Sequence, residues 1–439
     1  MKPRNLLIAA VVLAALSGAV WYSKRHPPST GAPTAATPKL VDIPEKDIQS
    51  VDLKKKDGST LTLQRQAGKW TITAPEQWRA DQDAATSLSS ALNPVSADSV
   101  VEDKASDLAK YGLNSPSLTV TVHRTNGKSD QVAFGDDVPA GSLVYAQANG
   151  NAKVYAVASS VKTSLDKSAS DLRDKRLLTF DTNKLTRVEV ASGKSDVEFG
   201  KNNQNEWQIL KPGPFRADSF QVEELLRKLT DAKMDLSAGA GDDLKKAAAY
   251  AAGSPDATVK VSDSTGTQTL EVHKDKDDYY AKSSVVDGAY KVSSDLGKSL
   301  AKSLDEFRNK KIFDFGFSDP TKIVLQNGSS EKTLVRSGTD WKINRQTIDP
   351  GTVQAFVDKL RDLAATKFVT SGFGTPNITI TITSNEGKRT EKAEFAKTSD
   401  GYLVRRENES ALYGLDAKSV NDTLDAGNAV KPAASTAKK

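Results

Sequence analysis

Histidine is the first residue type that could carry catalysis or metal binding in this chain, and it is scarce. The three histidines are His26, His123 and His273, and their spacing does not match that of metal ligands. The chain has no cysteine, which excludes disulfides, cysteine-ligated zinc, iron–sulfur clusters and thiol catalysis. The sequence therefore predicts no metal site and no catalytic histidine.

Serine–lysine and glycine-rich patterns also fall short of a known chemistry. A Ser-x-x-Lys spacing occurs at 159–162, 164–167 and 299–302, without the Ser-Asp-Asn and Lys-Thr-Gly elements of serine acyl-enzymes. The glycine-rich stretch 238–241 precedes no phosphate-loop lysine and follows no predicted strand. We therefore predict no catalytic and no cofactor-binding residues, and we expect a protein that is not an enzyme.

Aromatic and basic residues recur along the chain and could bind a ligand. Trp70, Trp207 and Trp341 are each followed two residues later by isoleucine. We interpret these rings as core or cross-strand packing, with an exposed Trp/Tyr stripe for carbohydrate or peptide as the alternative. The basic clusters at 173–176 and 310–311 are interpreted as helix caps that bridge adjoining units, since cations are favoured there. Contact with anionic lipid or polymer is their alternative.

The overall charge argues against nucleic acid as a partner. The 439 residues carry 61 basic and 56 acidic side chains, a net charge of only +5. Nucleic-acid binders concentrate basic residues to neutralise phosphates, whereas here Lys alternates with Asp and Glu as on a solvated surface.

The N-terminus has the pattern of a membrane anchor. Lys2 and Arg4 precede an uncharged run at 6–22, which Lys24 and Arg25 close. As a helix this run would span about 25 Å, close to a hydrocarbon core of about 30 Å. Small residues near its end leave a cleaved signal peptide as the alternative.

We therefore expect an anchor or signal at residues 1–23, followed by a Pro/Thr/Ala-rich stalk at 24–41 that stays extended. Long downstream domains are translocated largely regardless of their charge. We thus expect a single-pass protein of the cell inner membrane, with most of the chain in the periplasm or outside.

The folded part consists of an internal repeat. Two-residue hairpin signals at Asp57-Gly58, Ser192-Gly193 and Asn327-Gly328 recur at an interval of 135 residues. After each hairpin come the Trp-x-Ile pattern and an acidic helix start, at Asp81, Asp218 and Asp349. Three diverged copies of one unit therefore follow each other.

The second half of the unit recurs as well. A proline precedes an alternating strand in each copy, at Pro116, Pro255 and Pro376, and a glycine turn follows. The first two copies end in a basic-aromatic segment, which begins at Leu172 and Phe307 and which we call the seam. The third copy lacks this segment and ends in a polar tail.

These patterns predict an α+β protein of three tandem repeats of antiparallel β-sheet with packed helices, after one N-terminal transmembrane helix. The predicted boundaries are 42–178 for copy 1, 179–313 for copy 2, 314–427 for copy 3 and 428–439 for a disordered tail. Because the seam leads into the next hairpin without a linker, adjacent copies are expected to pack against each other.

The chain resembles the bacterial family known as domain of unknown function 4340. The resemblance rests on the Gly-Lys-Trp-x-Ile pattern at 68–72, the Ala-Asp helix start and the Tyr-Gly-Leu at 111–113. Copy 2 has Tyr-Ala-Ala at 250–252 instead, and copy 3 has Gly-Phe-Gly at 372–374. The family supplies no catalytic residues, and it implies an envelope location and association with gliding-motility-type ABC transport systems.

The resulting hypothesis is a membrane-tethered, non-enzymatic accessory or scaffold of an ABC-type envelope transport complex. Its expected partners are the membrane, through the N-terminal helix, and proteins of that complex. The alternative is a module that binds cell-wall polysaccharide or peptide through the repeated Trp and Tyr positions. No cofactor is expected.

Overall fold

The computed structural model describes residues 37–433 except 140, 194, 204, 237–239 and 317–319. Of residues 240–244 it describes the backbone alone. The predicted anchor at 1–23 lies outside these residues, as does the stalk up to residue 36. Among the residues that are described, no helix is long and apolar enough to cross a membrane. The chain divides after Asp174 into two compact units, which are treated separately.

Unit 1 contains copy 1, a nine-stranded sheet of antiparallel neighbours. Across the sheet its strands are β5 (Trp78–Arg79), β4 (Lys69–Ala74), β3 (Thr60–Gln66), β2 (Ile48–Lys55), β8 (Leu118–Arg124), β9 (Ser129–Asp137), β10 (Leu143–Ala148), β11 (Val154–Ala158) and β7 (Ser99–Glu102). A separate pair is formed by β1 (Lys39–Val41) and β6 (Val95–Ser96). The helical elements are η1 (Glu45–Asp47), α2 (Gln82–Ser90), η2 (Leu108–Tyr111), α3 (Ser159–Leu165) and α4 (Ala169–Leu172).

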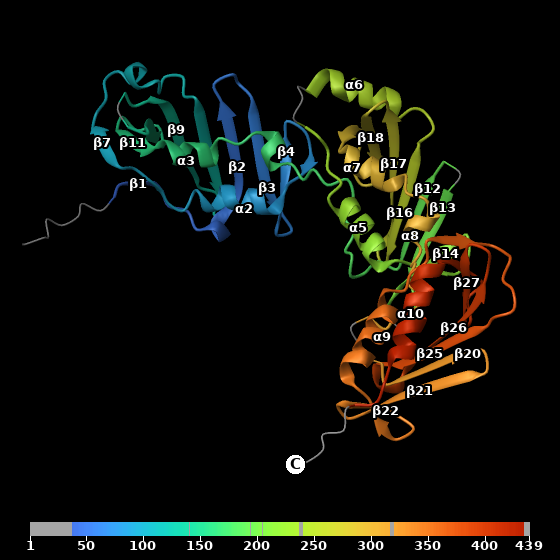
Figure 1. Ribbon diagram of the computed structural model, residues 1–439. Coiled ribbons are helices and arrows are strands. Elements are labelled where there is room, and N and C mark those ends of the chain that lie inside the picture. Colours follow the sequence, from blue (N-terminus) through green and yellow to red (C-terminus); the bar gives the residue numbers. More distant parts are fainter. Residues whose placement is uncertain are drawn as a thin grey trace, which may run out of the picture. The chain divides into compact units, whose positions relative to one another are not determined.

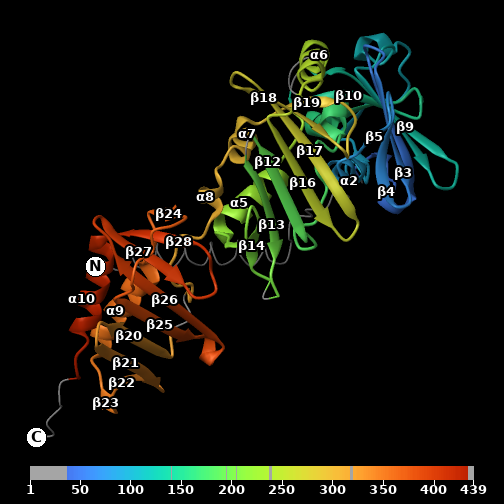
Figure 2. The same ribbon diagram turned by 90° about the vertical axis from the view of Figure 1, so that its right-hand side faces the viewer.

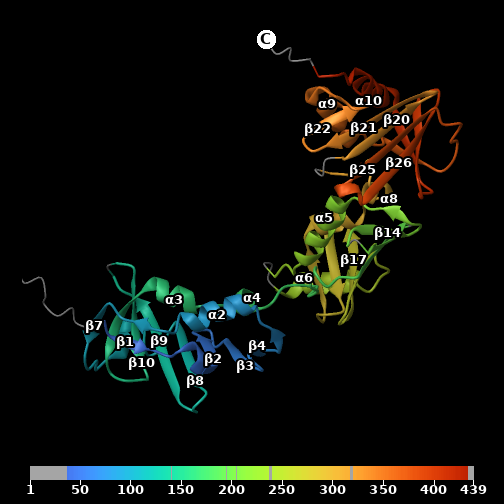
Figure 3. The same cartoon turned by 90° about the horizontal axis from the view of Figure 1, so that it is seen from below.

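The core of unit 1 lies on one face of this sheet. Val51 and Leu53 of β2 are buried together with Leu88 of α2 and Leu172 of α4. Strand residues point alternately to the two faces, so Asp52 between the two buried residues lies on the opposite face, which we call the outer face. Figure 3 shows α2, α3 and α4 along the core side of the strands.

Unit 2 contains copies 2 and 3. The copy 2 sheet runs in the order β15 (Phe215–Arg216), β14 (Trp207–Lys211), β13 (Ser195–Lys201), β12 (Arg187–Ser192), β16 (Ala257–Asp263), β17 (Gly266–Asp275), β18 (Asp278–Ser283) and β19 (Ala289–Val292). The copy 3 sheet runs in the order β23 (Gln346–Thr347), β22 (Asp340–Ile343), β21 (Ser330–Ser337), β20 (Lys322–Asn327), β25 (Ile378–Ser384), β26 (Arg389–Lys397), β27 (Gly401–Arg406), β28 (Leu412–Asp416) and β24 (Lys367–Val369).

Helices cover the core face of each of these sheets, and in copy 2 one helix also lies on the outer face. The helical elements of unit 2 are α5 (Ser219–Thr230), α6 (Ala240–Tyr250), α7 (Ser294–Leu300), α8 (Leu304–Phe307), α9 (Pro350–Asp362), η3 (Asn385–Gly387) and α10 (Ala417–Ala429). In copy 3, α9 and α10 lie side by side (Figure 1). In copy 2, α5 and α7 pack on the core face (Figure 2), while α6 contacts β17 to β19 through Ala247 and the outer-face residue Tyr280.

The α+β class with antiparallel sheets and packed helices is confirmed. The first eight strands of all three sheets follow the same order. They start at the short edge strand β5, β15 or β23 and end at β11, β19 or β28. The repeated hairpin glycines Gly58, Gly193 and Gly328 have φ angles of +86°, +60° and +60°. Such turns need positive φ, which glycine adopts without steric cost.

The later part of each seam, at 175–180 and 310–315, is the first strand-like element of the copy that follows, and copy 1 begins with the same element. The backbone amides of Ala97, Met234 and Ala365 donate to the carbonyls of Pro38, Lys175 and Lys310, at 2.8, 2.8 and 2.7 Å. The segment 38–43 in copy 1 therefore corresponds to 175–180 in copy 2 and 310–315 in copy 3. Residues 39–41, the last of the predicted stalk, form β1 in this segment.

The end of each copy is also closed in one way. The amides of Asp81, Asp218 and Asp349 donate to the carbonyls of Leu172, Phe307 and Lys431, at 2.8, 2.8 and 3.0 Å. In copies 1 and 2 this position is held by the start of the seam that leads into the next copy. In copy 3 the chain after α10 takes the same position. The predicted tail at 428–439 begins inside α10, and its residues 434–439 lie outside the described part.

The cap of α10 leads to a prediction on stability. The Asp416 carboxylate accepts from the amide and hydroxyl of Ser419, at 2.8 and 2.6 Å, and these bonds lower its pKa. We expect Asp416→Ala to lower the free energy of unfolding by about 1 kcal/mol at pH 7. A lowered folded-state pKa means that this contribution fades as the pH falls below 3.8. Urea unfolding should therefore separate variant and wild type at pH 7 and bring them together once the pH falls below the lowered pKa of Asp416, and Asp425→Ala in the same helix is the control.

Candidate functional site

A cluster of buried charges joins copy 2 to copy 3 inside unit 2. Arg308, Glu391 and Arg406 are each less than 9% exposed. Buried charges are costly unless they are paired. These three side chains and their partners are therefore candidates for a functional role.

Arg406 stands at the centre of the cluster. Its guanidinium binds the Glu391 carboxylate at 3.0 Å and the Glu409 carboxylate at 2.7 Å, and its Nη1 donates to the carbonyl of Ile312 in the seam. Glu391 in turn accepts from the amide of Asp314 at 3.0 Å. This pair therefore holds the seam of copy 3 on the end of β26 and β27.

Arg216, at the edge of copy 2, connects the cluster across the junction. It lies 3.3 Å from Asp314, 3.0 Å from Glu409 and 3.2 Å from the hydroxyl of Tyr413. The pKa of Arg216 is raised, although burial alone would lower it, because Tyr413 and Glu409 favour the charged guanidinium. Burial raises the pKa of Tyr413, with a further contribution from Glu409. Arg216 therefore stays charged and Tyr413 stays neutral around neutral pH.

A second arginine of copy 2 completes the junction through aromatic contacts. The guanidinium of Arg308 lies 4.2 Å from the ring centre of Phe215 and 3.5 Å from that of Phe368 in β24. Cations over aromatic faces are attracted by the ring quadrupole, more strongly when they are desolvated. Copies 2 and 3 are thus joined by ion pairs and by cation–π contacts.

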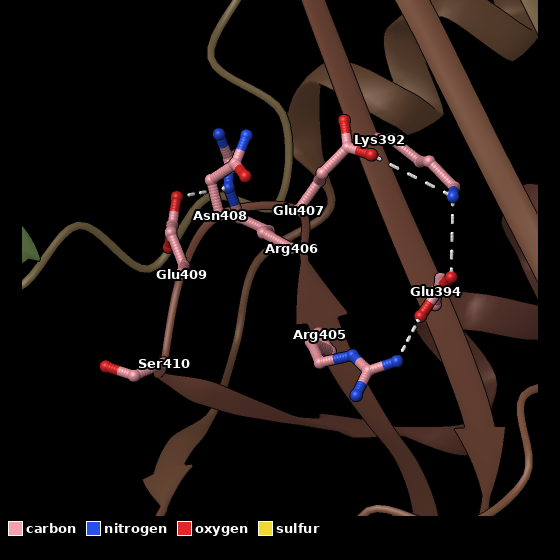
Figure 4. A pocket seen from close by; sticks show the side chains of 8 residues that line it. All are labelled: Lys392, Glu394, Arg405, Arg406, Glu407, Asn408, Glu409 and Ser410. Carbon is pink, nitrogen blue, oxygen red and sulfur yellow. Dashed lines mark hydrogen bonds and ion pairs between the residues drawn. The ribbon is translucent and has the colours of Figure 1, made fainter.

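A cavity of about 350 Å³ opens beside this cluster (Figure 4). It is lined by Lys392, Glu394, Arg405, Arg406, Glu407, Asn408, Glu409 and Ser410. Its three cations bind its three carboxylates: Lys392 lies 3.5 Å from Glu394, and Arg405 lies 2.6 Å from that group. The bond from Arg405 lowers the pKa of Glu394. The charged side chains that line the cavity therefore neutralise one another.

Copy 2 holds its own seam by a neutral version of this arrangement. Ser283 occupies the strand position of Arg406 and donates to the carbonyl of Leu177. Gln268 occupies the position of Glu391 and accepts from the amide of Thr179 at 2.8 Å. The buried ion pair of copy 3 therefore has a structural role that uncharged side chains also fulfil.

A serine–histidine–aspartate contact lies on the outer face of copy 1. His123 Nε2 is 2.9 Å from an Asp52 oxygen, and Nδ1 is 2.9 Å from the Ser129 hydroxyl. The hydroxyl of Thr62 donates to Asp52 at 2.7 Å. The side chains of His123 and Asp52 are 42% and 33% exposed. Sequence reasoning missed this group because Asp52 stands 71 residues before His123.

We interpret this contact as a polar cross-strand ladder. His123 and Ser129 are direct partners of β8 and β9, and Asp52 lies on the neighbouring strand β2. Directly opposed polar residues pair in this way on many solvated sheets. The order of the ring nitrogens is also reversed from that of serine hydrolases, in which the serine bonds Nε2.

This interpretation predicts that Ser129 is not an activated nucleophile. Treatment with a fluorophosphonate probe should leave Ser129 unlabelled, because a solvated histidine without a preorganised site activates a hydroxyl poorly. Peptide mass spectrometry of wild type and Ser129→Ala measures the labelling. Selective modification of Ser129 that disappears in His123→Asn would contradict both this interpretation and a non-enzymatic role.

The other residues singled out in the sequence are dispersed. Trp70 and Trp207 are 4% and 7% exposed in their cores, and Trp341 is partly buried against the copy 3 core. Ser299 bonds to a carbonyl of its own helix, and His273 is buried in β17. The structure brings none of these together, and His26 lies outside the described residues.

The Tyr-Gly-Leu motif has a packing role on the outer face. Tyr111 packs edge-on against Tyr145 at 4.9 Å and donates to Glu102 at 2.6 Å. In copy 2 the corresponding Tyr250 stacks on Tyr280 at 5.1 Å. In copy 3 the place is taken by Phe373, over which Arg405 lies at 4.6 Å. The motif thus provides an aromatic residue that covers the last strands of each sheet.

Comparison with known families agrees with this repeated architecture. The model of the domain of unknown function DUF4340 matches residues 70–208 and 207–378. The chain belongs to the DUF4340 family. Both matched segments of this DUF4340 protein begin at the tryptophan strand, β4 or β14, and extend into the next copy. Searches of curated proteins and of solved structures give no match.

Proposed function

We propose that this DUF4340 protein is a membrane-tethered extracytoplasmic repeat protein, which acts as a non-enzymatic accessory or scaffold of an ABC-type envelope transport complex. The observation that carries the proposal is the use of charge at the copy 2–copy 3 junction. Arg216 and Arg308 connect copy 2 to copy 3, and Arg406 holds the segment through which the chain enters copy 3, as suits a protein that presents surfaces at fixed positions.

The N-terminal sequence supports the tether. The uncharged run at 6–22 between basic flanks suits a single span of the inner membrane, with the folded copies outside the cytoplasm. Leu13→Arg should weaken membrane association, because a charge at the centre of a span costs about 2.5–3.5 kcal/mol in insertion. Carbonate extraction of membranes checks this, with Thr34→Arg in the predicted stalk as the control.

The partner proteins are tested by affinity purification. The tagged full chain is cross-linked mildly in cells and recovered from detergent-solubilised membranes, where we expect ABC-type permease and ATPase subunits to accompany it. Recovery of the chain alone would refute the scaffold role. The alternative role in binding polysaccharide or peptide would need exposed rings, and the burial of Trp70 and Trp207 removes two of them.

A further inference from the structure

The face of copy 3 that copy 2 covers provides the template for this inference. Four residues form this face, which we call the receiving face: Asp314 of the seam, Phe368 of β24, Glu409 in the turn before β28, and Tyr413 of β28. Arg216 bonds Asp314, Glu409 and Tyr413, and Arg308 lies over Phe368. An arginine beside an aromatic ring, Arg216 next to Phe215, is thus the element that this face binds.

Copy 1 has residues of the same kind at three of these positions. Val100 pairs with Tyr155 between β7 and β11 as Phe368 pairs with Tyr413 between β24 and β28. Asp42 lies four residues after Pro38, and Asp314 lies four residues after Lys310, so the two aspartates occupy equivalent positions. The receiving face of copy 1 therefore consists of an aspartate, which also pairs with Lys39 at 2.7 Å, an apolar residue and a tyrosine.

Among the described residues, part of this face of copy 1 is exposed to solvent. Val100 and Val101 are 38% and 41% exposed, among the few large apolar side chains in the described residues with such exposure. They lie on β7, the edge strand of the sheet. An exposed apolar edge strand invites pairing with another chain. Exposed Asp98 precedes β7, where a carboxylate suits a basic partner, whereas Asp103 after it is paired with Lys153 at 2.8 Å.

The position of the face also restricts its partner. Figures 1 and 3 place β7 at the same end of unit 1 as β1, where the chain enters from residue 36. A face at this end lies beside the start of the predicted stalk. Proteins of the membrane complex are therefore suited to reach it.

We propose that β7 and β11 of copy 1 form the docking surface for a protein of the membrane complex, whose extended segment presents an arginine beside an aromatic ring. The inference rests on the proposed function and names the surface through which that function operates. The end of copy 3 does not supply this element, because it carries Gln346, Thr347 and Pro432 where copy 2 carries Phe215, Arg216 and Arg308. Binding of a second copy through Trp78 and Arg79 of β5 is a separate outcome of the test below.

The experiment uses the full chain in its native membranes. A photo-cross-linking amino acid replaces Val100, Val101 or, as the matched control, Val335, which is 43% exposed in copy 3. In parallel, Val101→Lys is compared with Val335→Lys for co-purification of the proteins that wild type recovers. A lysine on an edge strand opposes pairing with another strand.

We expect a cross-link from 100 or 101, and none from 335, to an arginine- and aromatic-containing segment of a co-purified membrane protein. Val101→Lys should reduce recovery of that protein at least tenfold, with Val335→Lys unchanged. If wild type recovers partners and Val101→Lys recovers them equally, the docking surface is wrong and the scaffold role stands. If wild type recovers none, both fail. A cross-link to a second copy, or to residues before 37 of the same chain, also overturns the inference.

Discussion

Arg406→Ser is expected to lower the free energy of unfolding of unit 2 by about 3 kcal/mol, because removal of one member of a buried ion pair leaves the other charge poorly compensated. Glu391 is 6% exposed, and among the described residues it would keep Arg389, at 3.5 Å, as its cationic partner. The carbonyl of Ile312 would also lose its donor. The seam of copy 3 should therefore open first.

The companion variant follows from copy 2. Adding Glu391→Gln to Arg406→Ser gives copy 3 the pair that copy 2 uses, Ser283 and Gln268. Replacement of both members of a buried ion pair is often neutral, so the double variant should regain at least half of the lost stability. Arg405→Ser is the control for charge alone, since its side chain is 50% exposed and exposed pairs contribute less than about 1 kcal/mol.

Two measurements on the detergent-solubilised full chain check this expectation. Denaturant unfolding followed by tryptophan fluorescence reports stability, and hydrogen exchange at residues 310–315 reports opening of the seam. A loss in Arg406→Ser no larger than in Arg405→Ser would show that the buried pair does not hold the seam of copy 3. A double variant less stable than the single one would contradict the equivalence of the two seam attachments.

Gly135→Ala should destabilise unit 1 by about 3 kcal/mol, the upper range for overpacking. A Cβ at Gly135 would lie 2.0 Å from the carbonyl oxygen of Tyr111. That neighbour is backbone and cannot swing aside as a side-chain tip would. The Tyr111 segment would have to lift, which would break its hydrogen bond to Glu102 and its packing on Tyr145.

A matched glycine serves as the control. Gly374, near the corresponding segment of copy 3, has open space around its Cβ position and no positive φ. Gly374→Ala should leave stability unchanged or raise it by about 0.4–1 kcal/mol, through a less flexible unfolded chain. Thermal unfolding and hydrogen exchange at residues 108–113 compare the two. Equal behaviour would mean that the close approach of Gly135 to Tyr111 is unimportant.

The repeat and its sheets could be predicted from sequence because their determinants are local. The hairpin glycines require positive φ, the alternating strands require one apolar face, and Asp81, Asp218 and Asp349 all cap helices as predicted. These signals need no knowledge of distant residues. The seam was harder to assign. Its strand-like pairing with 95–97, 232–234 and 363–365 is set by contacts far along the chain, so its place at the start of each copy stayed hidden.

The charged junction could not be predicted for the same reason. Arg216 and Tyr413 are 197 residues apart, and nothing near either residue in the sequence marks it as a partner. In the sequence, the change from Ser283 and Gln268 in copy 2 to Arg406 and Glu391 in copy 3 resembles ordinary divergence. The strand pairing shows that the two pairs of residues occupy equivalent positions. The predicted anchor, its orientation and the transport partners stay predictions.

The direct passage from α8 into the seam has a mechanical consequence. Hydrogen bonds hold Phe307 to Asp218 on the copy 2 side and Ile312 to Leu363 on the copy 3 side, at 2.8 and 2.9 Å. Only four residues lie between these two fixed points, so there is no slack in the chain to lengthen under load. A pull between the N-terminus and the C-terminus would therefore be carried as tension straight through residues 307–312. Unit 2 should accordingly resist stretching until one of these attachments breaks, and then extend abruptly.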